Sequence, residues 1–419
     1  MKTDVRLSTR FLTAQNAHQV GLLVNLEGET PVRRAPINVA LVLDRSGSMS
    51  GAPLEAAKTA AARFVSFLAP QDRLSVVVFD DDVHTIFGPA AGGADAAAEA
   101  IGRVQAGGST NLSGGWLKGR TLVEQGRVEG TNRVLLLTDG QANQGIVEPT
   151  RLIGLAHHAS KARVSTTCIG FGRDFNEDLL ESMARAGAGN YWYVESDDQM
   201  AGIFDGEIEG LVALAAQNVE VEVRLSHPGV AGVSFLQSYP VTHTEAGGWK
   251  VQLHDLYATS PRALGLVFHV EDVGVLGKVQ LGEVRVEADL VTEEGIEHRT
   301  TVMPVFANLD GEDRVEPTVE QTFLRFRAAK AREEAVRQAD QGDFDSASAC
   351  LREAAAALAN WDGPDTREEI DDLQAEAAKM DQRRYDATDR KYQAARAMAA
   401  RDLKAEYAKR VSRRAPRKS

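Results

Sequence analysis

One short apolar run that ends in an acid constrains the fold of this chain more than any other feature. Residues 37–43 are almost entirely apolar, and Asp44, Ser46 and Ser48 follow directly. A run of this kind is typical of a strand buried on both faces, as in a parallel sheet. Open α/β sheets bind their ligands beyond the carboxyl ends of such strands. We therefore predict that the carboxylate and the two hydroxyls converge on a ligand, and hard oxygen groups of this type suit Mg²⁺.

Two later segments supply further oxygen groups for the same place. Residues 107–113 form a small, polar loop that offers the hydroxyl of Thr110 on a backbone made flexible by glycine. Residues 132–138 then repeat the first design, an apolar strand followed at once by Asp139 and a glycine. Asp139 is therefore expected at the same edge of the sheet as Asp44.

At these positions the chain resembles the von Willebrand factor A family and its metal-ion-dependent adhesion site. That site combines an Asp-x-Ser-x-Ser loop, a threonine from a second loop and an aspartate from a third. All its positions are matched here, in order, by Asp44, Ser46, Ser48, Thr110 and Asp139. The resemblance covers residues 36–205. It implies that the hydroxyl oxygens bind the metal directly and that the acids often act through water.

Other interpretations of the same loops are less specific. Aspartate and serine after a strand are common turn and N-cap residues, and a helical pattern starts at Pro53. A nucleophile elbow is excluded, because it would need serine where Met49 stands. The sequence Gly170-Phe171-Gly172 lacks the third glycine of a dinucleotide-binding fingerprint.

The remainder of residues 36–205 alternates strand and helix patterns, which predicts a doubly wound, Rossmann-like α/β sheet. The resemblance implies six strands, one of them antiparallel at the edge. The acids at 80–82 are read either as a charged hairpin turn or as a second cation site.

Outside this region the pattern changes twice. Residues 218–307 alternate with period two, which predicts an antiparallel β-sandwich. The first 35 residues are strand-like but too short to bury a core alone, so we expect them to join that sandwich around the inserted α/β domain. From Pro317 onward the pattern is helical. The expected organisation is N-terminal strands at 1–35, the α/β domain at 36–205, the β-sandwich at 206–310, a helical hairpin at 315–361, one long helix at 364–411 and a basic tail at 412–419.

Charge and composition exclude several classes of function. The net charge of −13 argues against nucleic-acid binding by the body of the protein. No apolar stretch is long enough for a membrane span, and the N-terminus lacks the pattern of a signal peptide. Two cysteines make no disulfide framework. These features lead us to expect a cytoplasmic, bacterial protein.

The resemblance implies a protein-binding module and not an enzyme. A bound Mg²⁺, or Mn²⁺ or Ca²⁺ in its place, would take an aspartate or glutamate from a partner protein into its open coordination position. Trp116, Asp81 and Asn143 are our candidates for further contacts with that partner. Bacterial relatives often work beside AAA+ ATPases of the MoxR type, which makes such an ATPase a candidate partner.

Two alternatives from other classes stay open. The chain could be a scaffold that binds through its C-terminal helices, with a metal of structural use only. It could also be a metal-dependent phosphoesterase, although the three loops offer no obvious general base or second metal site.

Overall fold

The computed structural model describes most of the chain in two compact units. The described residues are 1–8, 11–12, 18–29, 34–172, 174–258, 261–271, 277–292, 295–309, 316–361 and 364–402. Within them, no helix is both long and apolar enough to cross a membrane. The predicted basic tail at 412–419 lies outside the described residues.

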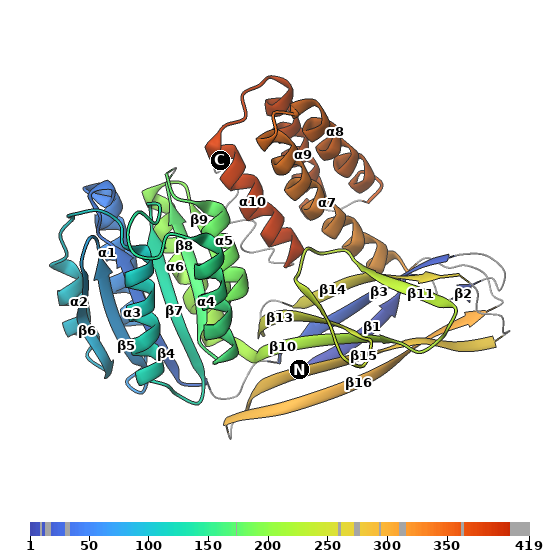
Figure 1. Ribbon diagram of the computed structural model, residues 1–419, viewed down its shortest axis with the longest axis horizontal. Coiled ribbons are helices and arrows are strands. Elements are labelled where there is room, and N and C mark those ends of the chain that lie inside the picture. The colour runs from blue at the N-terminus through green and yellow to red at the C-terminus, as the bar shows by residue number, and fades with distance from the viewer. Residues whose placement is uncertain are drawn as a thin grey trace. The chain divides into compact units, whose positions relative to one another are not determined.

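A six-stranded sheet forms the centre of the α/β domain (Figure 1). Its order is β6-β5-β4-β7-β8-β9; β6 runs antiparallel to β5 at one edge, and the other neighbours are parallel. The predicted doubly wound α/β sheet with one antiparallel edge strand is therefore confirmed. The strands are β4 (Ile37–Asp44), β5 (Arg73–Phe79), β6 (Val83–Ala91), β7 (Thr131–Thr138), β8 (Ser165–Phe171) and β9 (Ala188–Val194). The helices are α1 (Ala52–Ser66), α2 (Ala94–Gly102), α3 (Leu112–Gln125), α4 (Pro149–Lys161), α5 (Glu177–Ala186) and α6 (Asp197–Val212), with a short 3₁₀ turn, η1 (Gly47–Met49).

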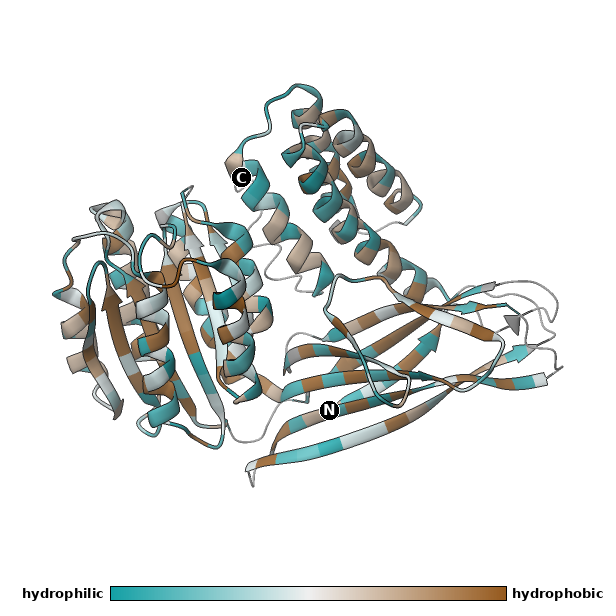
Figure 2. Ribbon diagram, viewed as in Figure 1, coloured by the Kyte–Doolittle hydropathy of each residue, from teal (hydrophilic) through white to brown (hydrophobic). Residues whose placement is uncertain are grey.

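The central strands are buried along their whole length. Every residue of β4 and of β7 is buried, as expected for parallel strands with helices on both faces. Figure 2 shows a contrast between the two units. Hydrophobic residues form continuous stretches along the strands of this sheet, whereas they alternate with polar residues along the strands of the second unit.

The second unit contains two sheets that share one hydrophobic core. Side chains from both sheets contribute to this core, among them Leu22 and Leu264 from one sheet and Val221 and Val284 from the other. The smaller sheet has the order β1-β3-β14-β11, with β1 (Lys2–Leu7), β3 (His18–Glu27), β14 (Arg262–Val270) and β11 (Val230–Phe235). The larger sheet has the order β12-β13-β10-β15-β16-β2, with β12 (Val241–His243), β13 (Trp249–Tyr257), β10 (Leu214–Leu225), β15 (Gly277–Thr292), β16 (Gly295–Leu309) and β2 (Phe11–Leu12).

The pairing of β3 with β14 joins distant parts of the sequence. The two strands are antiparallel, and their paired residues run from His18 opposite Val270 to Leu26 opposite Arg262. The chain thus leaves this sheet after β3, forms the α/β domain and returns to the same sheet at β11 and β14.

Four helices follow the strands: α7 (Pro317–Asp340), α8 (Phe344–Leu358), α9 (Pro364–Asp381) and α10 (Ala387–Arg401). The first turns of α7 pack on β3 and β14 through Phe323 and Phe326. Gly21 makes room for this contact, since a Cβ atom there would lie 2.3 Å from the Phe323 ring. A separate apolar core joins α7, α8 and α9.

The expected single helix over 364–411 is wrong. A turn after Asp381 separates α9 from α10, and Arg383 adopts a left-handed φ of 53° within it. Asp386 then starts the new helix with a capping box. Its carboxylate accepts the backbone N–H groups of Thr388 and Asp389, and the Asp389 carboxylate accepts the backbone N–H of Asp386. The apolar residues on both sides of this break keep the three- and four-residue spacing of a helix, so the hydrophobic pattern does not predict the break.

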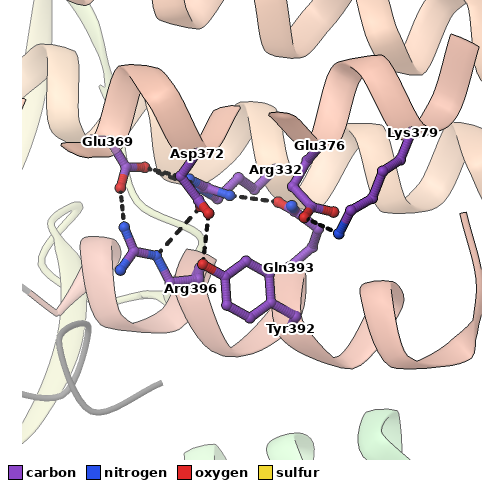
Figure 3. A network of polar contacts seen from close by, with 8 residues as sticks. All are labelled: Arg332, Glu369, Asp372, Glu376, Lys379, Tyr392, Gln393 and Arg396. Carbon is purple, nitrogen blue, oxygen red and sulfur yellow. Dashed lines mark hydrogen bonds and ion pairs between the residues drawn. The ribbon is translucent and has the colours of Figure 1, made fainter. Parts of the chain in front are cut away.

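A buried ionic network connects α7, α9 and α10 (Figure 3). Arg332 of α7 is fully buried, and its guanidinium donates to Glu369 and Asp372 of α9 and to Gln393 of α10. Arg396 of α10 donates to Glu369 as well. Burial alone would raise the pKa of Glu369, but the two guanidinium groups outweigh it and lower that pKa. This network holds the three helices in one arrangement, because displacing any of its charged groups would leave that group's partner without a counter-charge.

Arg332→Met should destabilise the second unit by about 3–5 kcal/mol, because it leaves the partly buried carboxylates of Glu369 and Asp372 without their main cation. Urea denaturation followed by circular dichroism measures the change. Arg352→Met is the matched control: Arg352 is half-exposed and pairs with Asp381, so its loss should cost no more than about 1 kcal/mol. Equal effects of the two substitutions would contradict the role given to the network.

Candidate metal centre

The register of β4 and β7 brings the first and third predicted loops together. Leu43 is paired with Leu137 in this parallel ladder, so the next residues, Asp44 and Thr138, lie at the same level. The Thr138 hydroxyl accordingly donates to Asp44 Oδ2 at 2.5 Å. Asp139 follows one residue further, at the carboxyl edge of the sheet.

Asp44 is a buried carboxylate that is held by neutral donors. It has no exposed surface, and its Oδ1 atom accepts the backbone N–H of Ser46 at 2.8 Å. Burial raises the pKa of Asp44 to about 6, although the hydrogen bonds from Ser46 and Thr138 act in the opposite direction. Among the described residues, no lysine or arginine forms an ion pair with it. An ionised Asp44 is therefore a negative charge that needs a cation nearby.

The two serine hydroxyls and Asp139 form a continuous chain of oxygen atoms. Ser46 Oγ lies 3.1 Å from Ser48 Oγ, and Ser48 Oγ donates to Asp139 Oδ1 at 2.8 Å. Ser48 is exposed, whereas Ser46 and Asp139 are buried. Burial raises the pKa of Asp139, and the nearby charge of Asp174 raises it further.

The second loop places Thr110 against the third. Thr110 is buried, and a Cβ atom on Gly140 would lie 3.0 Å from its Oγ1 atom. Its carbonyl oxygen accepts the backbone N–H groups of Asn143 and Gln144 at 3.2 and 3.3 Å. Asn111, the next residue, caps α3 by accepting the N–H of Gly114 at 3.0 Å. A side chain in place of Gly140 would therefore push Thr110 back by a few tenths of an ångström.

Arg45 and Asp80 tie these loops to one another, and the sequence analysis missed their pairing. Arg45 Nη2 lies 2.9 Å from Asp80 Oδ2, and the Arg45 carbonyl accepts the N–H of Gly107 at 2.8 Å. The Asp80 carbonyl accepts the N–H of Asn111. The acids at 80–82 occupy the hairpin turn between β5 and β6. Their position after a parallel strand next to β4 was the available signal, since it puts Asp80 beside Arg45.

The residues brought together fit a hydrated divalent cation. Three hydroxyls and two carboxylates gather at one edge of the sheet, and neutral hydroxyl and carboxylate oxygens are what Mg²⁺ and Mn²⁺ accept. Burial raises the pKa of both acids, and among the described residues neither carboxylate pairs with a lysine or arginine. Such an arrangement could hold a cation and leave part of its coordination shell open on the exposed side of Ser48.

Of the three predicted partner contacts, Trp116 is wrong. Its side chain is fully buried, and its indole N–H donates to Thr166 Oγ1 at 3.2 Å. Helix α3 turns its glycines toward the sheet, where Gly115 meets the Phe79 ring and Gly119 meets Val42. Trp116 lies between these glycines in sequence, and its side chain packs in the core.

Asp81 and Asn143 are exposed beside the candidate centre. Asp81 Oδ1 accepts the N–H of Ser109 at 3.0 Å and the side-chain N–H of Gln144 at 2.7 Å. It therefore braces the second loop against the third. Contact of Asp81 or Asn143 with a partner stays a prediction.

Comparison with known proteins identifies the domain. Residues 38–206 match the family model of the von Willebrand factor type A domain, so this chain is a protein with a VWA domain. The uncharacterized protein sll0103 of Synechocystis is 28% identical over 68% of this chain and 69% of its own length. Human inter-alpha-trypsin inhibitor heavy chain H3 is 28% identical over 48% of this chain, but the match spans only 24% of that longer protein. Neither name denotes an enzyme.

Two solved structures share the fold of almost the whole chain. A von Willebrand factor type A protein from Catenulispora acidiphila aligns with a TM-score of 0.70 at 18% identity, over 90% of this chain and 89% of its own. The ArnB paralog VWA2 from Sulfolobus acidocaldarius aligns with a TM-score of 0.62 at 15% identity, over 96% of this chain and 98% of its own. The strands and helices outside the VWA domain thus belong to a fold found elsewhere.

Asp44→Asn should stabilise the metal-free protein at pH 7.5 by roughly 1–3 kcal/mol. The folded state holds the Asp44 proton more tightly than the unfolded state does, because the folded pKa is raised to about 6. The contribution of this group to stability is therefore largest at low pH and is lost as pH rises from about 4 to about 6. Urea denaturation in EDTA at pH 7.5 and pH 4 tests this, and the difference between variant and wild type should nearly vanish at pH 4.

Asp72→Asn is the control for that experiment. Asp72 is equally buried, but it pairs with Arg34 and accepts the N–H groups of Ile37 and Ala69. Its substitution should therefore destabilise the protein at pH 7.5. Loss of stability in both variants would show that the Asp44 charge is already compensated.

Proposed function

We propose that this protein is a metal-dependent protein-binding module, and that its VWA domain captures a carboxylate of a partner through a divalent cation. VWA domains serve as interaction or adhesion modules in related proteins, which supports the general role. Ser46, Ser48 and Thr110 would hold the cation by their hydroxyl oxygens, and Asp44 and Asp139 would balance its charge. A cation held in this way offers a partner carboxylate a strong, directional contact.

One observation carries the proposal: the buried acid Asp44, whose pKa is raised, accepts the N–H of Ser46, and the Ser46 hydroxyl lies 3.1 Å from that of the exposed Ser48. The charge of Asp44 attracts a cation, while Ser48 marks the side on which solvent or a partner can reach it. A purely structural metal would be enclosed by protein groups on all sides. This contrast favours a binding site over a structural one.

Mg²⁺ is the proposed ion, since few charged ligands and several waters suit it. Mn²⁺ and Ca²⁺ stay as alternatives. An AAA+ ATPase of the MoxR type stays a candidate partner, and location in the cytoplasm stays a prediction.

Thr110→Ala should abolish the gain in thermal stability that Mg²⁺ or Mn²⁺ gives to the wild type, because one hydroxyl ligand is lost. The fold should be kept, since the backbone bonds of Thr110 to residues 143 and 144 do not need its side chain. Differential scanning fluorimetry over a metal titration measures the shift. Thr121→Ala is the control: Thr121 is exposed on α3 and bonds only to Leu117 of the same helix, so it should respond to metal like wild type.

The same pair of variants tests partner binding. Wild type and Thr121→Ala should retain proteins from a lysate of the source cells in Mg²⁺ and release them in EDTA, whereas Thr110→Ala should retain none of these. Retention that is insensitive to both EDTA and Thr110→Ala would rule out the proposed role of the metal and favour binding through the C-terminal helices.

A further inference from the structure

The rim around the candidate metal centre is acidic beyond what the metal can balance. The two acids of the centre, Asp44 and Asp139, would together cancel the charge of one divalent cation. Arg45 is the one basic residue that the described part of these loops places at the rim, and Asp80 pairs with it at 2.9 Å. Three exposed acids are left over, namely Asp81, Asp82 and Asp174.

The loops that carry these acids lie at the same edge of the sheet as the centre. Asp81 is bonded to the backbone next to Thr110 and to Gln144. Asp82 is the next residue in the same turn, and its N–H donates to Asp80 Oδ1 at 3.0 Å. Asp174 lies in the loop after β8, whose Gly170 is paired with Thr138, the residue before Asp139. Arg173 lies outside the described residues, and even its full formal charge would leave two acids in excess.

A lone carboxylate approaching this rim meets like charge on several sides. Its contact with the cation favours binding, but the surrounding acids oppose it, and salt screens this repulsion with a Debye length of about 8 Å at physiological ionic strength. Basic groups beside the carboxylate would turn this repulsion into attraction. Charges arranged in this way govern partner choice more than they govern affinity.

We infer that the partner presents its metal-binding aspartate or glutamate within a basic segment, with lysine or arginine on both sides of the acid. This inference rests on the proposed function and adds the chemistry of the partner to it. Exposed charge pairs change affinity by about 1.5- to 5-fold each. Two flanking basic residues should therefore give a preference of about 2- to 25-fold over a neutral segment.

The test uses the full chain and three biotinylated peptides of equal length on a streptavidin surface. Each peptide contains one central aspartate, which is flanked by lysines, by glutamines or by glutamates. Binding is measured in Mg²⁺ and in EDTA, at low and at high salt. The expected order of affinity is lysine, then glutamine, then glutamate, with differences that shrink toward equality at about 0.5 M salt.

Two double variants locate the effect. Asp82→Asn with Asp174→Asn removes two rim charges and should reduce the preference for the lysine peptide several-fold, while the metal-dependent thermal shift persists. Asp95→Asn with Glu129→Gln makes the same charge change at the opposite edge of the sheet, where β6 ends and β7 begins, and should leave the preference unchanged.

The outcomes separate this inference from the proposed function. Metal-dependent binding of all three peptides with equal affinity would overturn the inference and leave the proposed function standing. A preference that the opposite-edge variant weakens as much as the rim variant would also overturn it. Binding of no peptide in a metal-dependent way would remove the proposed function and this inference together.

Discussion

The parallel alignment of β4 with β7 is the constraint on which the candidate centre depends. It sets Asp44 level with Thr138, so that a hydroxyl from one strand end reaches the buried carboxylate of the other. Because both faces of both strands are covered, a slip by one residue would exchange the side chains that pack on the two faces and disrupt the close-packed core. The packing of the core therefore fixes the positions of Asp44 and Asp139 at the ends of these strands.

Much of this arrangement could be predicted from the sequence because two independent signals agree. Apolar runs that end in an acid identify central parallel strands, and the carboxyl ends of such strands meet at one edge. The spacing of Asp44, Ser46 and Ser48 then adds a motif to the geometry. The hydrogen bonds among Ser46, Ser48 and Asp139 show how closely the first and third loops approach.

The parts that could not be predicted depend on orientation. The short distance from Thr110 in sequence predicts that Trp116 is exposed near the centre. The direction of its side chain is instead set by the glycines of α3 that pack on Phe79 and Val42. The break between α9 and α10 is local as well: it needs the left-handed Arg383 and the cap at Asp386, while the apolar spacing on either side looks continuous. In both cases a short-range backbone preference decided the outcome, and hydrophobic periodicity does not report on it.

The pairing of β3 with β14 has a consequence for synthesis. β3 ends at Glu27 and β14 begins at Arg262, so a ribosome working at roughly 5–20 residues per second needs on the order of 10–50 seconds to supply the second strand. During that interval Val20, Leu22, Val24 and Leu26, all fully buried in the finished protein, have only β1 beside them. The nascent chain must therefore keep this apolar strand from aggregating until β14 has been made.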